Sequence, residues 1–212
     1  MPHRLRVVER DGRLLLGFAS AVDNVGTRPL VIEGRRTARF PGMLVRQLVG
    51  GRRVAFRGAL RYVRSPDHAH WHLLGFERYE LRRPDGRRVR RDRKTGFCLT
   101  DSYDADARML PGEPRRAVWT AECGRHHPDL LRVRAGISVG FRDVYHAFLE
   151  GQEVDITGLR TGRYVLVHRV NPRRALRESR YENNAASVLL SIRGARVRVL
   201  AHCPDSARCD KK

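Results

Sequence analysis

The hydrophobic residues of this sequence recur mainly in short runs with the spacing of β-strands. Residues 13–25 form a long apolar run that ends at a turn signal, and residues 163–170 are rich in valine. Residues 187–192 alternate between apolar and polar positions for the most part, and residues 196–200 alternate strictly. Short segments of this kind, separated by Gly, Pro and Asn, are typical of β-sandwiches and barrels. The pattern therefore predicts an all-β fold, which we interpret as a β-sandwich.

Helical periodicity is almost absent. Two short windows, residues 42–48 and 142–149, have a pattern compatible with a turn or two of helix. Residues 101–140 carry little regular pattern, and we expect long loops there, which in a compact domain are often functional. Neither an internal repeat nor a domain-splitting linker is visible, and 212 residues suffice for one domain with a buried core. We therefore expect residues 1–212 to form one catalytic domain with little helix.

The apolar runs are too short to suggest a membrane span. No run reaches the roughly eighteen apolar residues of a transmembrane helix, so we expect none. The first residues lead into strand-like sequence and lack the apolar core of a signal peptide. We expect either a protein that is not exported or one whose signal is not part of this sequence.

The formal net charge of +20 at pH 7 is the strongest compositional feature. Nearly all basic side chains are arginine, since the only lysines are Lys94, Lys211 and Lys212. A GC-rich genome, which favours arginine codons, explains this bias without any function. A polyanion partner, such as nucleic acid or an acidic cell-surface polymer, is the alternative explanation. Because aromatic residues that could stack on bases are sparse, we do not expect a nucleic-acid partner.

The chain contains four cysteines: Cys98, Cys123, Cys203 and Cys209. No C-x-x-C occurs, and neither pair has the spacing of a zinc ribbon. Two disulfides formed in an oxidising compartment are therefore predicted, with four buried thiols as the alternative. Four cysteines allow three connectivities, and their spacing does not choose between them.

His68, His70 and His72 alternate with Ala69 and Trp71. On a strand this alternation puts all three imidazoles on one face. In a flat strand the outer two would lie about 13 Å apart, too far for one metal ion with bonds of about 2 Å. The segment must therefore bend or break if the three histidines share an ion.

An exposed polar face is a poor explanation for three alternating histidines beside a tryptophan, so we predict a metal site. Imidazole-only ligation suits copper or zinc, and an open position would admit water or dioxygen. A zinc hydrolase with a three-histidine site is therefore a competing hypothesis.

Further motifs follow the histidine segment SPDHAHWHLLGFERYEL in order. They are KTGFCLTD at residues 94–101, DVY at 143–145 with EVDIT at 153–157, and VNP at 170–172 with ESRYENN at 178–184. Together these motifs resemble the lysyl oxidase family, whose copper segment has a similar run of alternating histidines. The resemblance covers roughly residues 60 to 190, and RLLLGFASAVDNVG near the start resembles the family's opening strand.

The resemblance assigns His68, His70 and His72 as copper ligands, and Lys94 and Tyr145 as the precursors of a lysine tyrosylquinone cofactor. It implies a copper-dependent quinone amine oxidase of the protein-lysine 6-oxidase type. Such an enzyme converts primary amines to aldehydes. Lysine residues of proteins or peptides are the expected source of these amines. Dioxygen is consumed, and ammonia and hydrogen peroxide are released. It also implies an extracellular or cell-surface location.

The chemistry of Lys94 supports its assignment. Arginine cannot replace this lysine, because a guanidinium group stays protonated and is not a nucleophile in proteins. This arginine-rich chain nevertheless keeps one internal lysine, at the position that the family requires. We expect Arg91 and Arg93 to lower the pKa of Lys94. Taken alone, Lys94 would be interpreted as a solvated charge and Tyr145 as an ordinary aromatic.

A general base is also required. By their proximity in sequence, the candidates are Asp67, Asp101, Asp104 and Asp143.

Two departures from the family pattern change the expected details. Asp67 stands where animal members have a cysteine, so a disulfide to the histidine segment should be missing. With the resemblance in view, we expect Cys98 to pair with Cys123 and Cys203 with Cys209.

The second departure is Arg180, which replaces an aspartate in a motif that resembles a calcium-coordinating turn. A cation beside Glu178, Asn183 and Asn184 would oppose bound calcium. Two alternatives to the amine oxidase remain: an inactive copper-binding relative, and a polyanion-binding β module with incidental histidines.

Overall fold

The chain folds into strands and the loops that join them. The structure, a computed structural model, describes residues 5–65, 68–92, 94, 96–105 and 109–210. In this described part there are seventeen strands and no helix, which confirms the all-β fold class. The described residues accordingly contain no helix that could cross a membrane.

The strands are, in chain order, β1 (Leu5–Arg10), β2 (Arg13–Phe18), β3 (Ser20–Asp23), β4 (Leu30–Arg35), β5 (Gly42–Val49), β6 (Arg52–Val63), β7 (His70–Leu74), β8 (Glu77–Arg82), β9 (Arg88–Arg91), β10 (Gly96–Phe97), β11 (Tyr103–Asp104), β12 (Arg132–Ile137), β13 (Phe141–Tyr145), β14 (Glu153–Asp155), β15 (Gly162–Val170), β16 (Ala185–Arg193) and β17 (Arg196–Cys203).

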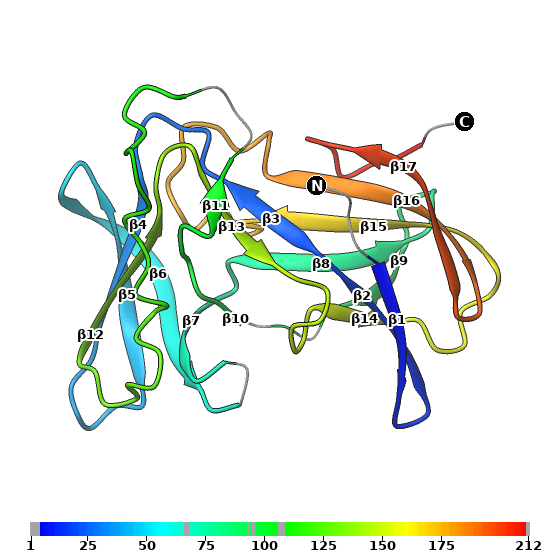
Figure 1. Cartoon of the computed structure of the whole chain (residues 1–212), viewed down its shortest axis with the longest axis horizontal. Helices are drawn as coiled ribbons and strands as arrows, with labels where there is room; N and C mark the ends of the chain where they lie inside the picture. Colours follow the sequence, from blue (N-terminus) through cyan, green and yellow to red (C-terminus); the bar gives the residue numbers. More distant parts are fainter. Residues whose placement is uncertain (1–4, 66–67, 93, 95, 106–108, 211–212) are drawn as a thin grey trace.

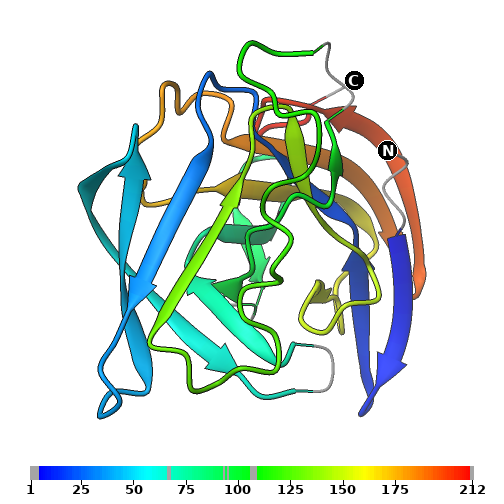
Figure 2. The same ribbon diagram turned by 60° about the vertical axis from the view of Figure 1, so that its left-hand side comes forward.

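These strands form four antiparallel sheets. The largest has the order β10-β7-β6-β5-β4-β12, and the next has the order β17-β16-β15-β8-β9. Two three-stranded sheets, β1-β2-β14 and β11-β13-β3, complete the fold. The six-stranded sheet forms the left-hand part of the molecule in Figure 1, and the five-stranded sheet runs across its right-hand part. In Figure 2, β16 and β17 curve around the side opposite the six-stranded sheet.

One hydrophobic cluster connects all four sheets. It includes Leu16 of β2, Ile32 of β4, Leu81 of β8 and Phe141 of β13, all buried. Burial of an aliphatic or aromatic side chain of this size contributes about 1.5–3 kcal/mol to folding. The shared core therefore fixes the sheets relative to one another, and with them the loops that carry the candidate site.

The structure corrects three sequence predictions. Residues 42–48 belong to strand β5, and residues 142–149 include the end of β13, so both helical windows are wrong. Strand β5 pairs with β4 and β6, and its burial alternates because successive side chains of a strand point to opposite faces: Met43 and Val45 lie inside and Leu44 outside. The stretch 101–140, expected to be loops, also contains β11 and β12.

Both expected disulfides are present. Cys98 bonds to Cys123, and Cys203 bonds to Cys209. The backbone N–H of Trp71 donates to the carbonyl of Cys123 at 3.1 Å. The first disulfide therefore joins the segment that follows Lys94 to a loop that rests on the histidine strand.

Candidate active site

The three predicted metal ligands converge because the strand does not extend through all of them. Strand β7 begins at His70, while His68 lies in a turn whose N–H donates to the carbonyl of Ser65 at 3.1 Å. One ring nitrogen from each of the three histidines lies within 4.8 Å of the others. The predicted break in the strand is therefore confirmed, and it allows the outer histidine to turn back toward its neighbours.

The protonation of these histidines suits metal binding. Burial lowers the pKa of His70 to about 4, with the nearby His68 adding to the shift, and burial also lowers the pKa of His72. Both rings are therefore neutral at pH 7, the state that binds a metal. Nε2 of His70 and Nε2 of His72 lie 2.7 Å apart, and Nδ1 of His70 is buried without a hydrogen-bond partner. Such a group of neutral donors fits a copper or zinc ion.

Gly96 brings the lysine segment onto the histidine strand. Strand β10 pairs with β7, and Gly96 lies opposite Leu74. A Cβ atom at Gly96 would lie 2.6 Å from the Cβ of His72, so this close approach requires glycine. The charge of Lys94, two residues before Gly96, contributes to the lowered pKa of His72. The two predicted parts of the site are therefore neighbours.

The lysine and the tyrosine meet inside the protein. Nζ of Lys94 lies 4.3 Å from the ring centroid of Tyr145 and 4.8 Å from that of Phe97. The same Nζ donates a hydrogen bond to Oε1 of Gln152 at 3.2 Å. Tyr145, at the end of β13, is 7% exposed. The fold thus brings together two residues that are far apart in the sequence.

Burial gives Lys94 an unusually low pKa. Removal of the ammonium group from water lowers the pKa of Lys94 from 10.5 to about 8, although the charges of Glu77, Asp143 and Asp92 oppose this shift. The predicted direction is confirmed. The largest cause is burial, whereas the prediction named Arg91 and Arg93, of which Arg93 lies outside the described residues.

Asp143 is the candidate general base that contacts the site. The Tyr145 hydroxyl lies 2.7 Å from Oδ2 of Asp143 and also bonds to the carbonyl of Cys98. Both oxygens are acceptors for the single proton of this hydroxyl. Burial raises the pKa of Asp143 well above its ordinary value.

The other candidate bases have different surroundings. Asp101 accepts hydrogen bonds from the backbone N–H groups of Val118, Trp119 and Ser138, and so holds a loop in place. Asp104 is exposed on β11, and Asp67 lies outside the described residues.

A buried polar network, which the sequence did not reveal, supports Gln152. Nε2 of Gln152 donates to Oγ of Ser20 at 3.0 Å, and Ser20 shares a 2.7 Å hydrogen bond with the Tyr79 hydroxyl. Tyr79 in turn donates to Glu77 at 2.7 Å, and Nε2 of His168 lies 2.6 Å from the same carboxylate oxygen. Glu77 and Tyr79 are two apart on β8, but Ser20, Gln152 and His168 come from distant parts of the chain, so no spacing in the sequence connects them to this pair. The one sequence feature that could have indicated this network is the set of polar residues in the strand-like stretch FERYEL, which follows the histidines.

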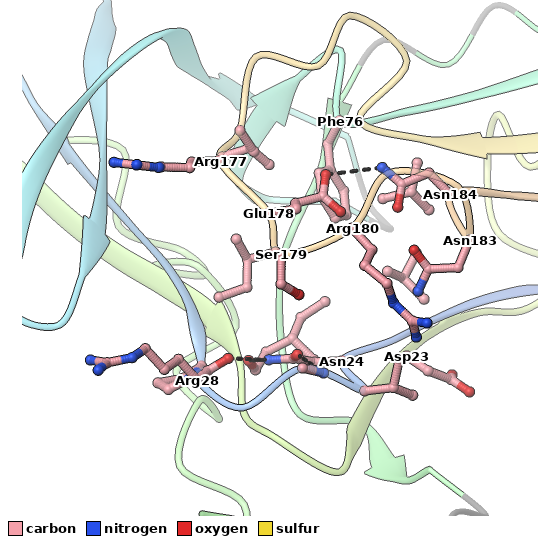
Figure 3. Close-up of a pocket in the computed structure, with 18 of the residues that line it drawn as sticks. Asp23, Asn24, Arg28, Phe76, Arg177, Glu178, Ser179, Arg180, Asn183 and Asn184 are labelled. Atoms are coloured by element: carbon pink, nitrogen blue, oxygen red, sulfur yellow. Dashed lines mark hydrogen bonds between the residues drawn. The ribbon is translucent and has the colours of Figure 1, made fainter.

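A cavity of about 820 Å³ lies elsewhere, beside the motif suggested to bind calcium. Figure 3 shows the Arg180 side chain extending from the Glu178 loop in the direction of Asp23. Oε1 of Glu178 already accepts hydrogen bonds from Asn184, at 3.0 Å, and from Asn171. A guanidinium group and an occupied carboxylate do not fit a calcium site.

Comparison with known proteins identifies the family. A family model described as lysyl oxidase matches residues 31–203, so the chain belongs to the lysyl oxidase family. It is 34% identical to protein-lysine 6-oxidase of Gallus gallus over 184 residues, which are 86% of this chain and 34% of that protein. It is 29% identical to lysyl oxidase homolog 3 of Homo sapiens over 134 residues, which are 61% of this chain and 15% of that protein. The chain therefore spans about a third or less of these two relatives.

Proposed function

We propose that this chain is a copper-dependent quinone amine oxidase of the protein-lysine 6-oxidase type. In the proposed reaction a primary amine, dioxygen and water give an aldehyde, ammonia and hydrogen peroxide, so that two electrons pass from the amine to dioxygen. The observation that carries this proposal is the 4.3 Å between Nζ of Lys94 and the ring of Tyr145. A lysine tyrosylquinone can form from these two residues only if the amine reaches the ring.

His68, His70 and His72 would hold the copper, and the neutral state of His70 and His72 supports this assignment. The ion would supply the oxidising chemistry that modifies the ring of Tyr145. The same three histidines would suit a zinc hydrolase. A buried lysine beside a tyrosine ring has no role in such a hydrolase, and therefore the amine oxidase is the better-supported function.

The side chains around the pair have distinct proposed roles. Gln152 holds the amine of Lys94 through its 3.2 Å hydrogen bond. The pKa of Lys94, lowered by burial to about 8, leaves part of this amine uncharged and nucleophilic at neutral pH. Asp143 is assigned as the base that takes a proton from the carbon next to the substrate amine. Its place beside the hydroxyl of Tyr145, which would become part of the cofactor, supports that role.

Lysine side chains of proteins or peptides are the proposed substrates. The name protein-lysine 6-oxidase, given to a relative with 34% identity, supports this choice. We also propose an extracellular or cell-surface location, which the two disulfides support because such bonds persist in oxidising compartments.

The test is Lys94→Arg, which keeps the charge and removes the nucleophile. The variant should bind about one copper per chain, in keeping with the one histidine cluster found among the described residues. It should lack a covalent link between the peptides that contain residues 94 and 145, and release no peroxide with an alkylamine. Lys211→Arg, the same chemical change near the end of the chain, is the matched control and should behave as the parent.

Three outcomes would contradict the proposal in different ways. Equal turnover by Lys94→Arg and the parent would reject the role of Lys94. A parent protein that binds copper but forms no cross-link would be an inactive relative. Full occupancy by zinc that added copper does not change would favour the zinc hydrolase. Loss of the metal in His70→Ala would in that case still show that the three histidines form the metal site.

A further inference from the structure

The outer face of the six-stranded sheet carries a cluster of arginines around one carboxylate. Glu33 of β4 lies directly opposite Arg46 of β5 on one side and Arg134 of β12 on the other. We call the cluster the arginine face; its members are Arg35, Arg46, Arg53, Arg132 and Arg134. The six-stranded sheet that carries it is at the left of Figure 1.

Glu33 shows which chemistry this face binds. Its carboxylate accepts hydrogen bonds from Arg35 at 2.8 Å, from Arg53 at 2.9 Å, and from Arg132 and Arg134 at 2.9 Å each. The side chain of Glu33 is only 1% exposed, whereas those of the four arginines are 48–54% exposed. A guanidinium group has five N–H donors, so most donors of these four remain directed away from Glu33. The face therefore has excess positive charge and spare donors suited to further carboxylates.

An apolar side chain lies within the same face. Leu44 of β5 is 80% exposed and lies directly opposite Arg35. Arginine combined with exposed apolar groups is typical of surfaces that bind polypeptides. A phosphate backbone offers Leu44 no apolar contact. The composition of the face therefore favours an acidic polypeptide over nucleic acid.

The arginine face and the histidines share one side of the sheet. Leu44 pairs with Ala59 of β6, Arg61 follows two residues later, and Arg61 pairs with His72 of β7. Paired residues, and residues two apart on a strand, have side chains on the same face. Strands β4 and β7 are separated by β5 and β6 and so lie about 14 Å apart. A chain segment that crosses these strands would span both features.

We propose that the arginine face docks an aspartate- or glutamate-rich segment of a protein substrate beside the histidine site. This proposal rests on the proposed function and names its substrate class. The proposal also explains how a positively charged substrate group can approach this protein, because a net charge of +20 repels a free cationic amine. A lysine carried by an acidic polypeptide is instead attracted.

The first experiment measures binding of fluorescent poly-L-glutamate to the full chain at about 0.1 M salt. The probe has no lysine, so the result does not depend on turnover. Arg35→Gln/Arg134→Gln should weaken binding about tenfold, since two guanidinium contacts to carboxylates are lost. Arg163→Gln/Arg196→Gln on exposed positions of β15 and β17 removes the same charge and should change binding less than about twofold.

A second variant guards against a folding defect. Arg46 lies opposite Glu33 but makes no hydrogen bond or ion pair within the described structure, so Arg46→Gln, which adds no charge beside Glu33, should fold normally. It should still weaken binding of poly-L-glutamate. Equal losses in the face and control variants would overturn the proposal in favour of net charge alone. Tighter binding of duplex DNA than of poly-L-glutamate would overturn the choice of a polypeptide partner.

The second experiment compares two substrates of the active protein. The variant Arg35→Gln/Arg134→Gln should have a higher KM for a glutamate-rich peptide that contains lysine. Its kcat/KM for butylamine should equal that of the parent protein. An unchanged KM for the peptide would reject docking even if the enzyme is active. Absence of turnover with both substrates would reject the proposed function, while binding of poly-L-glutamate would still test the arginine face.

Discussion

The protonation of Lys94 leads to a quantitative prediction about formation of the cofactor. Burial lowers the pKa of Lys94 from 10.5 to about 8. At pH 7 about one molecule in ten then has a free amine at this position, against roughly three in ten thousand for an ordinary lysine, a gain of about 300-fold. Only the free amine is a nucleophile. The rate of cross-linking between Lys94 and Tyr145 should therefore change about tenfold per pH unit below pH 7, and level off above about pH 8.

The assay starts from copper-free protein. Copper is added in air-saturated buffer at fixed pH values between about 5.5 and 9.5, and the cross-linked peptide is quantified by mass spectrometry over time. Copper content is measured at each pH as a control, and it should be nearly constant because His70, with a pKa lowered by burial to about 4, stays neutral. A rate that is flat between pH 6 and 8 would refute the reasoning. A rate that keeps rising up to about pH 9.5 would show that Lys94 titrates as an ordinary lysine.

The same shift has a consequence for stability that checks its sign. Because the pKa of Lys94 is lower in the folded than in the unfolded chain, the unfolded chain binds more protons between about pH 8 and 10.5. The contribution of this group to the free energy of unfolding is therefore fully present above the unfolded pKa and is lost as pH falls through the folded pKa. The difference is about 3 kcal/mol. Lys94→Met should remove that part of the pH dependence in chemical denaturation.

Three further substitutions test the neighbours of the pair. Asp143→Asn should reduce kcat for a small amine by about 10²- to 10⁴-fold while the cross-link still forms, which steady-state kinetics and mass spectrometry measure separately. Gln152→Leu removes the acceptor of the Lys94 amine and should slow cross-linking without loss of copper. Gln152→Glu should slow cross-linking at pH 7, because an added negative charge raises the pKa of Lys94. At pH 9 the rate of cross-linking in this variant should return toward that of the parent. Cys123→Ala should lower the free energy of unfolding by about 2–4 kcal/mol, and by more than Cys209→Ala, because the disulfide loops span 25 and 6 residues respectively.

The fold class was predictable because strand alternation is a local signal. The errors arose where a short window is compatible with two periods. Residues 42–48 contain apolar side chains at both helical and strand spacings, and the pairing partners β4 and β6 decide the outcome. Strand β12 was missed for a related reason: Arg132–Ile137 is a strand because it pairs with β4, a partner almost a hundred residues earlier.

The candidate site divides in the same way. The histidines were predicted from local spacing, and Lys94 and Tyr145 from resemblance, with the scarcity of lysine as independent support. Gln152, however, acts through contacts with Lys94 and Ser20 that exist only in the folded chain. The cause of the lowered pKa of Lys94 was hidden for the same reason. A run of neighbouring arginines is visible in the sequence, but burial is a property of the fold.

The position of the charges, and not only their sum, determines how this protein meets a cationic substrate. The net charge of +20 acts at long range, and salt screens it beyond about 10 Å at 0.1 M. At short range the field near Lys94 has the opposite sign, because Glu77 and Asp92 both act to raise the pKa of that lysine. The pKa of Asp92, raised by burial to about 6, leaves it ionised at pH 7. In the proposed function, interior carboxylates would stabilise a lysine side chain that has come close, while the arginines outside would attract the acidic chain that carries it. The two charge distributions would then act on different parts of one substrate, so an overall positive charge is compatible with the proposed oxidation of amines.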